Sequence, residues 1–465
     1  MVSGAVAMLF HSQIFLIAFL PAAVAGYYAL ARNKIAREWF LIAASAVFYA
    51  WWDVRFLPLL FVHIAVTWIA ARLYGRTGQR AFLTGAIVLN FASLGFFKYW
   101  MFLAGSIEAA LGLSLPAAGI VLPIGISFFT FQLVSYLIDM LRQDAPQYPL
   151  RRLALFVMLF PHLIAGPIVR HSEIMPQFDE DPLRAGVEER LARGIVLLFL
   201  GILLKVALAD RLAGVADPLF AAAGGGVPSA AEAWTATIAF ALQIYFDFMA
   251  YSEMAIGLAV MFGLRFPLNF DVPYRSTSLQ EFWRRWHMTL SRFLRDYLYI
   301  ALGGSREGTA RLVIATIATM GLCGLWHGAG WTFVVWGLMH GVGLLVVRAW
   351  GLLGRPLPAP VAWLATFGFV AVAFMLFRAP DFAVALRMGE GLVGFGGLGR
   401  LPAAGTLVLM AIAMGLALLP RPNPVLVETW LRPAAPLATA IALLGVFLVL
   451  EVGDGQPASF IYFQF

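Results

Sequence analysis

Long apolar runs separated by short polar segments dominate the pattern of residues along this chain. Each run is long enough to cross the hydrocarbon core of a bilayer as one α-helix, although 37–52 only just reaches that length. We therefore predict an all-α, polytopic integral membrane protein that forms a single domain over residues 1–465. The predicted spans lie near 8–31, 37–52, 55–74, 81–103, 117–141, 190–209, 233–262, 311–327, 331–350, 358–377, 404–420 and 435–451.

Arginine and lysine gather in alternate loops, and this asymmetry predicts the orientation of the chain, because positively charged loops stay on the cytoplasmic side. The segments expected in the cytoplasm are 32–37, 72–80, 142–152 and 264–311, and those expected outside are the residues around Asp53, 104–116, 214–232 and both termini. The run 153–169 breaks the alternation. Its residues Pro161, His162, Gly166 and Pro167 predict a re-entrant segment with an interrupted helix.

The composition agrees with a membrane protein: hydrophobic residues make up 62% of the chain and charged residues 12%, and the mean hydropathy is +0.85. The net charge of +7 lies in short loops between apolar runs, so we assign it to membrane topology and expect no nucleic-acid partner. The lone Cys323 excludes a disulfide framework and a thiolate metal site.

Residues 269–340 contain most of the polar residues that are candidates for a catalytic or binding role. At 100° per residue the aromatic and aliphatic side chains of 282–297 fall on one helix face and the arginines on the other, which predicts an interfacial helix. His287 lies at the margin of the apolar face and can point inward; the alternative is a solvated histidine. The apolar face holds Phe282, Trp286, Leu290, Phe293 and Tyr297, and the basic face holds Arg284, Arg285, Arg292 and Arg295.

His327 ends a predicted span and precedes Gly328-Ala329-Gly330, which leave little side-chain bulk over the imidazole. An imidazole there can take a proton from an attacking hydroxyl as a general base. The alternative is an interhelical hydrogen bond from a neutral histidine. His340, thirteen residues further on, would approach His327 only across a tight turn, and we expect it to be structural.

A polar stripe marks the span 233–262, where Gln243, Asp247 and Tyr251 recur every four residues and so share one helix face. Such a stripe lines a cavity or binds another helix. With Trp326 and Trp331, which flank His327, and with Arg284 and Arg292, these residues form the predicted substrate-binding set.

The chain contains no HExxH, GxSxG, P-loop or cysteine-pair motif, which argues against most hydrolase, ATPase and metal chemistries. Histidines with carboxamide or carboxylate partners suit acyl transfer, because the donor is already an activated thioester and the enzyme must position and deprotonate the acceptor. We expect neither a bound cofactor nor a metal.

An ordered set of motifs resembles the membrane-bound O-acyltransferase family, and within it the alginate O-acetyltransferase branch. The motifs are YAWWDVRFL, FFKYW, LPIGISFFTFQLVSYLIDMLR, FPHLIAGPIVRHSEIMPQF, YFDFMAYSEMAIGLAVMFG, NFDVPYRSTSLQEFWRRWHMTLSRFLRDYLYIALGG and GLWHGAGWTFVVWGLMHG. Family members carry Ser-Gly and Asp where this chain has Met249, Ala250 and Glu253.

The resemblance implies spanning, re-entrant and interfacial helices around a central funnel, with a core near 117–350 followed by helices over 358–465. It makes His327 the catalytic histidine and His287 a second functional histidine. It also implies a multi-pass protein of the bacterial inner membrane. The acyl donor would be a cytoplasmic co-substrate, acetyl-CoA or an acyl carrier thioester, and the acceptor a polysaccharide or a periplasmic acetyltransferase partner.

Three alternatives stay open from the sequence: D-alanyl transfer to teichoic acid, a transporter of acyl groups, and a scaffold of a polysaccharide export complex. The arginines also leave two choices, since guanidinium groups bind the phosphates of a thioester donor or those of lipid headgroups.

Overall fold

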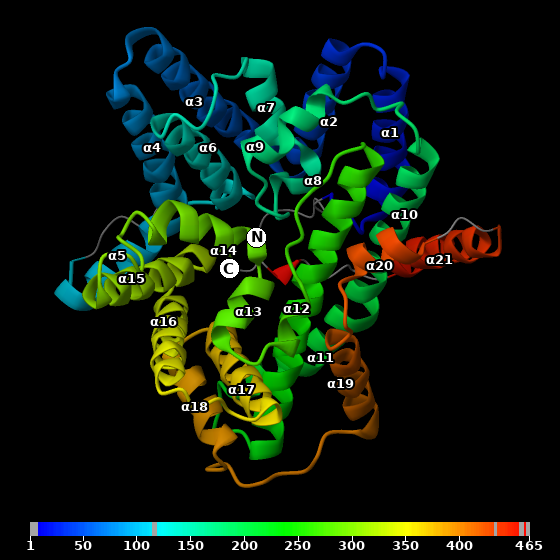
Figure 1. Cartoon of the computed structure of the whole chain (residues 1–465). Coiled ribbons are helices and arrows are strands. Elements are labelled where there is room, and N and C mark those ends of the chain that lie inside the picture. Colours follow the sequence, from blue (N-terminus) through cyan, green and yellow to red (C-terminus); the bar gives the residue numbers. More distant parts are fainter. Residues whose placement is uncertain (1–7, 114–118, 432–434, 455–459, 462–465) are drawn as a thin grey trace. The chain divides into compact units, whose positions relative to one another are not determined.

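The computed structural model describes residues 8–113, 119–431, 435–454 and 460–461, and in this part of the chain every regular element is a helix (Figure 1). Seven helical stretches of the described residues are long and apolar enough to cross a membrane: Lys34–Thr77, Arg80–Leu111, Val187–Ala222, Ala230–Met261, Thr309–His327, Trp331–Leu352 and Ala359–Arg378. The prediction of an all-α, multi-pass membrane protein is confirmed.

The chain forms two compact units. Unit 1 comprises 1–200, 252–267 and 427–457, and unit 2 comprises 201–251, 268–426 and 458–465. Unit 1 contains α1 (Leu20–Ala29), α2 (Lys34–Asp53), α3 (Leu57–Thr77), α4 (Arg80–Leu94), α5 (Trp100–Leu111), α6 (Ile126–Leu141), α7 (Leu150–Met158), α8 (Phe160–Leu163), α9 (His171–Ile174) and α21 (Ala435–Asp454).

Unit 2 contains the helices that carry the two predicted catalytic histidines. They are α11 (Asp210–Ala222), α13 (Leu279–Arg285), α14 (Met288–Leu294), α15 (Thr309–His327), α16 (Trp331–Leu352), α17 (Ala359–Arg378), α18 (Phe382–Leu392) and α19 (Ala404–Ala417). Three further helices, α10 (Val187–Leu204), α12 (Ala230–Met261) and α20 (Asn423–Trp430), contain residues of both units.

The predicted span over 117–141 is shorter in the structure than the sequence indicates. Residues 119–125 are not helical, and α6 begins at Ile126; residues 117 and 118 lie outside the described part. Gly125 has a φ of 76°, and Pro123 lacks the backbone N–H that a helix interior uses. The two residues therefore end the extended segment and set the start of the helix.

The predicted outside loop 214–232 is wrong in its first half. Helix α11 continues to Ala222 with Pro218 inside it, and the helical run from Val187 is unbroken. Pro218 removes one backbone donor but leaves the remaining hydrogen bonds of this apolar helix in place. The proline is therefore a poor guide to the end of the helix.

The interruption predicted in 153–169 is present. Helix α7 ends at Met158, and Leu159, with ψ near 110°, separates it from α8. All residues from 153 to 169 are buried, and the Phe160 N–H donates to Ser45 Oγ at 3.1 Å. Protein side chains thus cover the broken backbone, as a low-dielectric environment requires. That the segment is re-entrant stays a prediction.

Candidate functional site

Close contact between helices α15 and α16 fixes the position of His327, which lies at the end of α15. A Cβ atom on Gly324 would lie 2.1 Å from the carbonyl oxygen of Phe333, and one on Gly337 would lie 2.1 Å from that of Met320. Only glycine fits at these two positions, because real Cβ atoms do not approach backbone that closely. The turn Gly328–Gly330 is correspondingly short, and His327 is the last residue of α15.

His327 lies inside a cluster of aromatic rings and is only 4% exposed. The centroid of its imidazole lies 5.0 Å from the ring of Trp326, 5.2 Å from Trp336 and 5.5 Å from Phe377. All three contacts are close to edge-to-face, the arrangement that aromatic quadrupoles favour. The cluster therefore holds the imidazole in a defined orientation and excludes water around it.

His287 reaches the same region from the connection between α13 and α14. Its φ of 41° and ψ of 52° place it in the left-handed region, which is strained for a residue with a side chain. Backbone hydrogen bonds stabilise this conformation: the Met288 N–H donates to the Asn269 carbonyl at 2.9 Å, and the Asp271 N–H donates to that of Arg285 at 2.9 Å. The side chain of His287 is completely buried.

Asn269 selects the tautomer of His287. The Asn269 Oδ1 atom accepts from Thr289 Oγ1 at 2.8 Å and from the Thr289 backbone N–H at 3.4 Å, so the atom facing the imidazole is an oxygen. His287 Nδ1 lies 3.0 Å from the same oxygen and therefore carries the proton. The lone pair of the neutral ring is on Nε2.

The two predicted catalytic histidines are neighbours. The ring centroids of His287 and His327 lie 6.3 Å apart, and Trp326 contacts both rings. Burial lowers the pKa of His287 from 6.5 to about 3, so this imidazole is neutral at physiological pH. A neutral ring with a fixed lone pair accepts a hydrogen bond well but is a weak base.

The structure corrects the interfacial helix predicted over 282–297. The helix is broken at Trp286 and His287 into α13 and α14, followed by a π-helical turn over Arg295–Tyr299. The predicted apolar face is nonetheless the buried one at Phe282, Trp286, Leu290 and Phe293. The solvated alternative for His287 is wrong, because the broken backbone turns its side chain into the interior.

His340 has the structural surroundings that the sequence indicates. The indole Nε1–H of Trp283 donates to His340 Nδ1 at 3.2 Å, which joins α13 to α16. Trp336 lies between His340 of α16 and His327 of α15, 4.8 Å from the His340 ring and 5.2 Å from the His327 ring. His340 thus packs against Trp336 within the aromatic cluster, which agrees with a structural role.

The carboxylate of Asp247 takes part in an ion pair that the sequence pattern does not reveal. Lys205 Nζ lies 2.6 Å from Asp247 Oδ1 and 2.7 Å from Asp210 Oδ1, and the Ile461 N–H donates to Asp247 Oδ2 at 2.7 Å. Lys205 and Asp247 are both buried. The polar stripe on α12 therefore binds other elements of unit 2 at this point, and a substrate-binding role for Asp247 stays a prediction.

Tyr251 is 2% exposed, stacks on Phe460 at 4.6 Å and lies one turn after Phe248, whose ring meets His287 at 4.6 Å. This aromatic row connects the ion pair to the site. Gln243 is buried on α12, and Trp326 belongs to the histidine cluster.

The remaining predicted substrate-binding residues differ from these in burial. Arg284 is exposed, Arg292 is half-buried, and Trp331 is 55% exposed at the start of α16. Arg284 and Trp331 are accordingly not part of the buried aromatic cluster. A role for them, or for Arg292, requires contact with a ligand that reaches their surface.

Sequence reasoning missed Asn269, Phe248 and Lys205. A signal existed for Lys205, because an ionisable residue inside an apolar run calls for a partner. Asn269 and Phe248 carry no such signal, since their roles depend on where the chain folds back.

Comparison with known proteins identifies the class. The model of the membrane-bound O-acyltransferase family matches residues 125–387. The chain is 42% identical over 402 residues to the probable alginate O-acetylase AlgI of Pseudomonas aeruginosa, an alignment that covers 84% of this chain and 75% of the relative. It is 38% identical over 427 residues to the peptidoglycan O-acetyltransferase of Helicobacter pylori, covering 84% and 81%.

A teichoic acid D-alanyltransferase of Streptococcus thermophilus is 29% identical over 239 residues, covering 49% of this chain and 57% of the relative. The chain belongs to the membrane-bound O-acyltransferase family, as its motifs predict. It is a multi-pass membrane enzyme that transfers acyl groups to oxygen.

Proposed function

We propose that this enzyme transfers an acetyl group from a cytoplasmic thioester donor, across the bacterial inner membrane, to hydroxyl groups of an extracytoplasmic polysaccharide or of a periplasmic relay protein. The observation that carries the proposal is the pairing of His287 and His327 in one buried aromatic cluster. Two histidines supplied by separate elements and shielded from water suit transfer between substrates that arrive from different sides.

The chemistry follows from the surroundings of the two rings. His327 takes the proton of the acceptor hydroxyl as its oxygen attacks the thioester carbonyl; a C–O bond forms, the C–S bond breaks, and the proton passes to the leaving thiolate. His287 presents its Nε2 lone pair to an O–H or N–H group of a substrate, and Asn269 keeps the ring in that tautomer. Exclusion of water by the aromatic rings limits hydrolysis of the thioester.

The substrate-binding residues divide between the two sides of this proposal. Arg292 and Arg284 would bind donor phosphates, for which guanidinium groups are well suited. Trp326 would contact the acyl group beside the histidines, Trp331 the acceptor, and Gln243, Asp247 and Tyr251 would bind substrate from α12. No tightly bound cofactor is required, because the donor is consumed as a co-substrate.

Acetyl transfer is preferred over D-alanyl transfer because the two acetyl-transferring relatives align with 84% of this chain at 42% and 38% identity, against 49% and 64% of the chain at 29% and 27% identity for two teichoic acid D-alanyltransferases. Membership of a family of O-acyltransferases argues against the transporter and scaffold alternatives.

Sealed vesicles test the sidedness of transfer. Purified protein is reconstituted in each of the two orientations separately, radiolabelled acetyl-CoA or an acetylated acyl carrier is added outside, and alginate or peptidoglycan fragments are enclosed in the lumen. We expect labelled ester in the lumen only when the face bearing 264–311 meets the donor. Label in the lumen regardless of orientation, or only with a D-alanyl donor, would contradict the proposal.

Orientation itself is read from a cysteine introduced at Ser305 in a Cys323→Ala background. A membrane-impermeant thiol reagent should label it in inverted inner-membrane vesicles and leave it unlabelled in intact spheroplasts.

Arg292→Ala should raise the KM for the donor, whereas Arg295→Ala, at an exposed arginine paired with Asp296, should not.

A further inference from the structure

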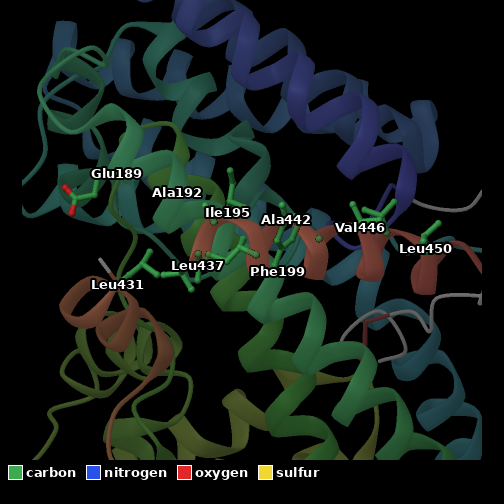
Figure 2. A pocket seen from close by; sticks show the side chains of 14 residues that line it. Glu189, Ala192, Ile195, Phe199, Leu431, Leu437, Ala442, Val446 and Leu450 are labelled. Atoms are coloured by element: carbon green, nitrogen blue, oxygen red, sulfur yellow. The ribbon is translucent and has the colours of Figure 1, made fainter. Parts of the chain in front are cut away.

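Unit 1 carries a large apolar groove between the start of α10 and the length of α21 (Figure 2). Its volume is about 940 Å³. Glu189 is the one charged residue among those that line it. The lining residues are Glu189, Ala192, Ile195, Val196, Phe199, Leu431, Leu437, Ala438, Ile441, Ala442, Gly445, Val446, Val449 and Leu450.

The sequences of the two helices explain why a groove forms there. The lining residues of α21 recur as neighbouring pairs every four positions, so they form one continuous helix face. Ala438 and Ala442 leave space along that face. At Gly445 the helices meet, since a Cβ atom there would lie 2.5 Å from the ring of Phe199. Small residues thus make the hollow, and the Phe199–Gly445 contact closes it on one side.

The groove is open to the surroundings of the protein. Ile195 is 38% exposed, Val446 60% and Leu450 61%. From Leu437 to Leu450 the face extends roughly 20 Å at the helical rise. This is long enough for an acyl chain, because the chains of one bilayer leaflet fill only ~15 Å. Helix α10 begins a stretch long and apolar enough to cross a membrane, and α21 is a shorter apolar helix, so an acyl chain suits the polarity of the face between them.

The Glu189 end of the groove is polar. In Figure 2 Glu189 and Leu450 lie at opposite ends of the row of lining residues. Arg193, one turn after Glu189, places Nη2 2.8 Å from the Glu189 carboxylate and donates to the carbonyl of Glu428 at 3.0 Å. Adjacent opposite charges complement a headgroup that has both an ammonium and a phosphate, the first toward Glu189 and the second toward Arg193.

We propose that this groove binds one phospholipid with an ammonium headgroup, of the phosphatidylethanolamine class, with an acyl chain along α21. The inference does not depend on the proposed function, because unit 1 alone supplies the lining and the polar end.

The test measures lipid bound to full-length protein by native mass spectrometry in a non-ionic detergent, after addition of dioleoyl phosphatidylethanolamine. Ala442→Trp fills the groove, and Leu443→Trp is its matched control, because Leu443 is adjacent, 66% exposed and not part of the lining. We expect roughly tenfold weaker binding in the first variant and wild-type binding in the second. Ala438→Trp repeats the test four residues earlier.

Wild-type lipid binding by both groove-filling variants overturns the proposal, and so does equal loss in Leu443→Trp. A second copy of the chain in the groove, seen as a dimer that Ala442→Trp dissociates, also overturns it.

The headgroup is tested by competition between phosphatidylethanolamine and anionic phosphatidylglycerol. Wild-type protein should prefer the former, and Glu189→Gln should reduce that preference, whereas Glu188→Gln, at an exposed neighbour outside the lining, should leave it unchanged. No preference in the wild type, or the same preference in Glu189→Gln, overturns the assignment of the headgroup.

Discussion

His287 and His327, forty residues apart in sequence, place their imidazole rings 6.3 Å from each other inside a cage of aromatic side chains. The two histidines come from different elements: His287 lies in the segment 264–311, which we expected in the cytoplasm, and His327 ends a predicted span. In the proposed function, this adjacency would let donor and acceptor meet at a single site that both rings form.

Burial of His287 predicts a pH dependence of stability. Because its pKa is lowered to about 3 in the folded protein, the unfolded chain binds a proton below pH 6.5 that the folded chain does not bind. The free energy of unfolding should consequently fall as the pH decreases from about 6.5 toward 3, by about 1.4 kcal/mol per unit from this residue, and be unaffected by it above 6.5.

Denaturation in a detergent series at pH 7, 6, 5 and 4 measures this slope in the wild type and in His287→Asn, since asparagine tolerates the left-handed backbone. Equal slopes for the two proteins would show that His287 does not contribute.

Asn269 should act as a positioning residue for His287. Asn269→Leu removes the acceptor for Nδ1–H, so we expect at least about a tenfold loss of kcat with little change in KM. Asn269→Asp keeps the acceptor and adds charge, which stabilises the imidazolium and should move the acid limb of the pH profile upward. Thr289→Val, which removes only the Thr289 bond to Asn269, is the control. Wild-type kcat in Asn269→Leu would refute the role.

Close packing of α15 on α16 predicts that one glycine of α16 does not tolerate replacement by alanine, whereas another glycine of the same helix does. Gly337→Ala places a methyl group against the carbonyl of Met320 and should cost at least about 2 kcal/mol by overpacking. Gly351→Ala meets no atom within 4 Å and should be neutral or slightly stabilising. Thermal unfolding followed by size-exclusion chromatography distinguishes them; equal Tm values for both variants would contradict the packing argument.

The buried pair of Lys205 and Asp247 predicts an asymmetry between single and double substitutions. Lys205→Met leaves a buried carboxylate without its cation and should destabilise the protein by about 3–5 kcal/mol. Lys205→Met combined with Asp247→Leu removes both charges and should recover part of that loss. Arg311→Ala, at an exposed pair with Glu307, is the control and should change stability by less than about 1 kcal/mol.

A double variant no more stable than Lys205→Met would argue against the pair. A rise in KM with unchanged stability in Asp247→Asn would instead support the predicted substrate-binding role of Asp247.

Apolar run length predicted most of the helices, because a hydrocarbon solvent leaves the chain few alternatives to helix. His327 could be identified from the sequence because it precedes a glycine-containing turn and lies in a motif of the family. The break at His287 was not predictable, since no glycine or proline marks it and the hydrogen bonds that stabilise it come from Asn269 and Asp271, earlier in the chain. Helices α18 and α20 were also missed, because both are shorter than a membrane span.

The role of His327 as the general base is tested by the acyl transfer rate of His327→Gln, measured with purified, reconstituted protein at saturating thioester donor. Glutamine keeps a polar side chain of similar length but has no basic nitrogen, so the aromatic cage should remain folded while proton removal is lost. We expect a Tm equal to that of the wild type and a rate at least about a hundredfold lower. A folded His327→Gln protein that transfers acyl groups at the wild-type rate would show that His327 is not the base.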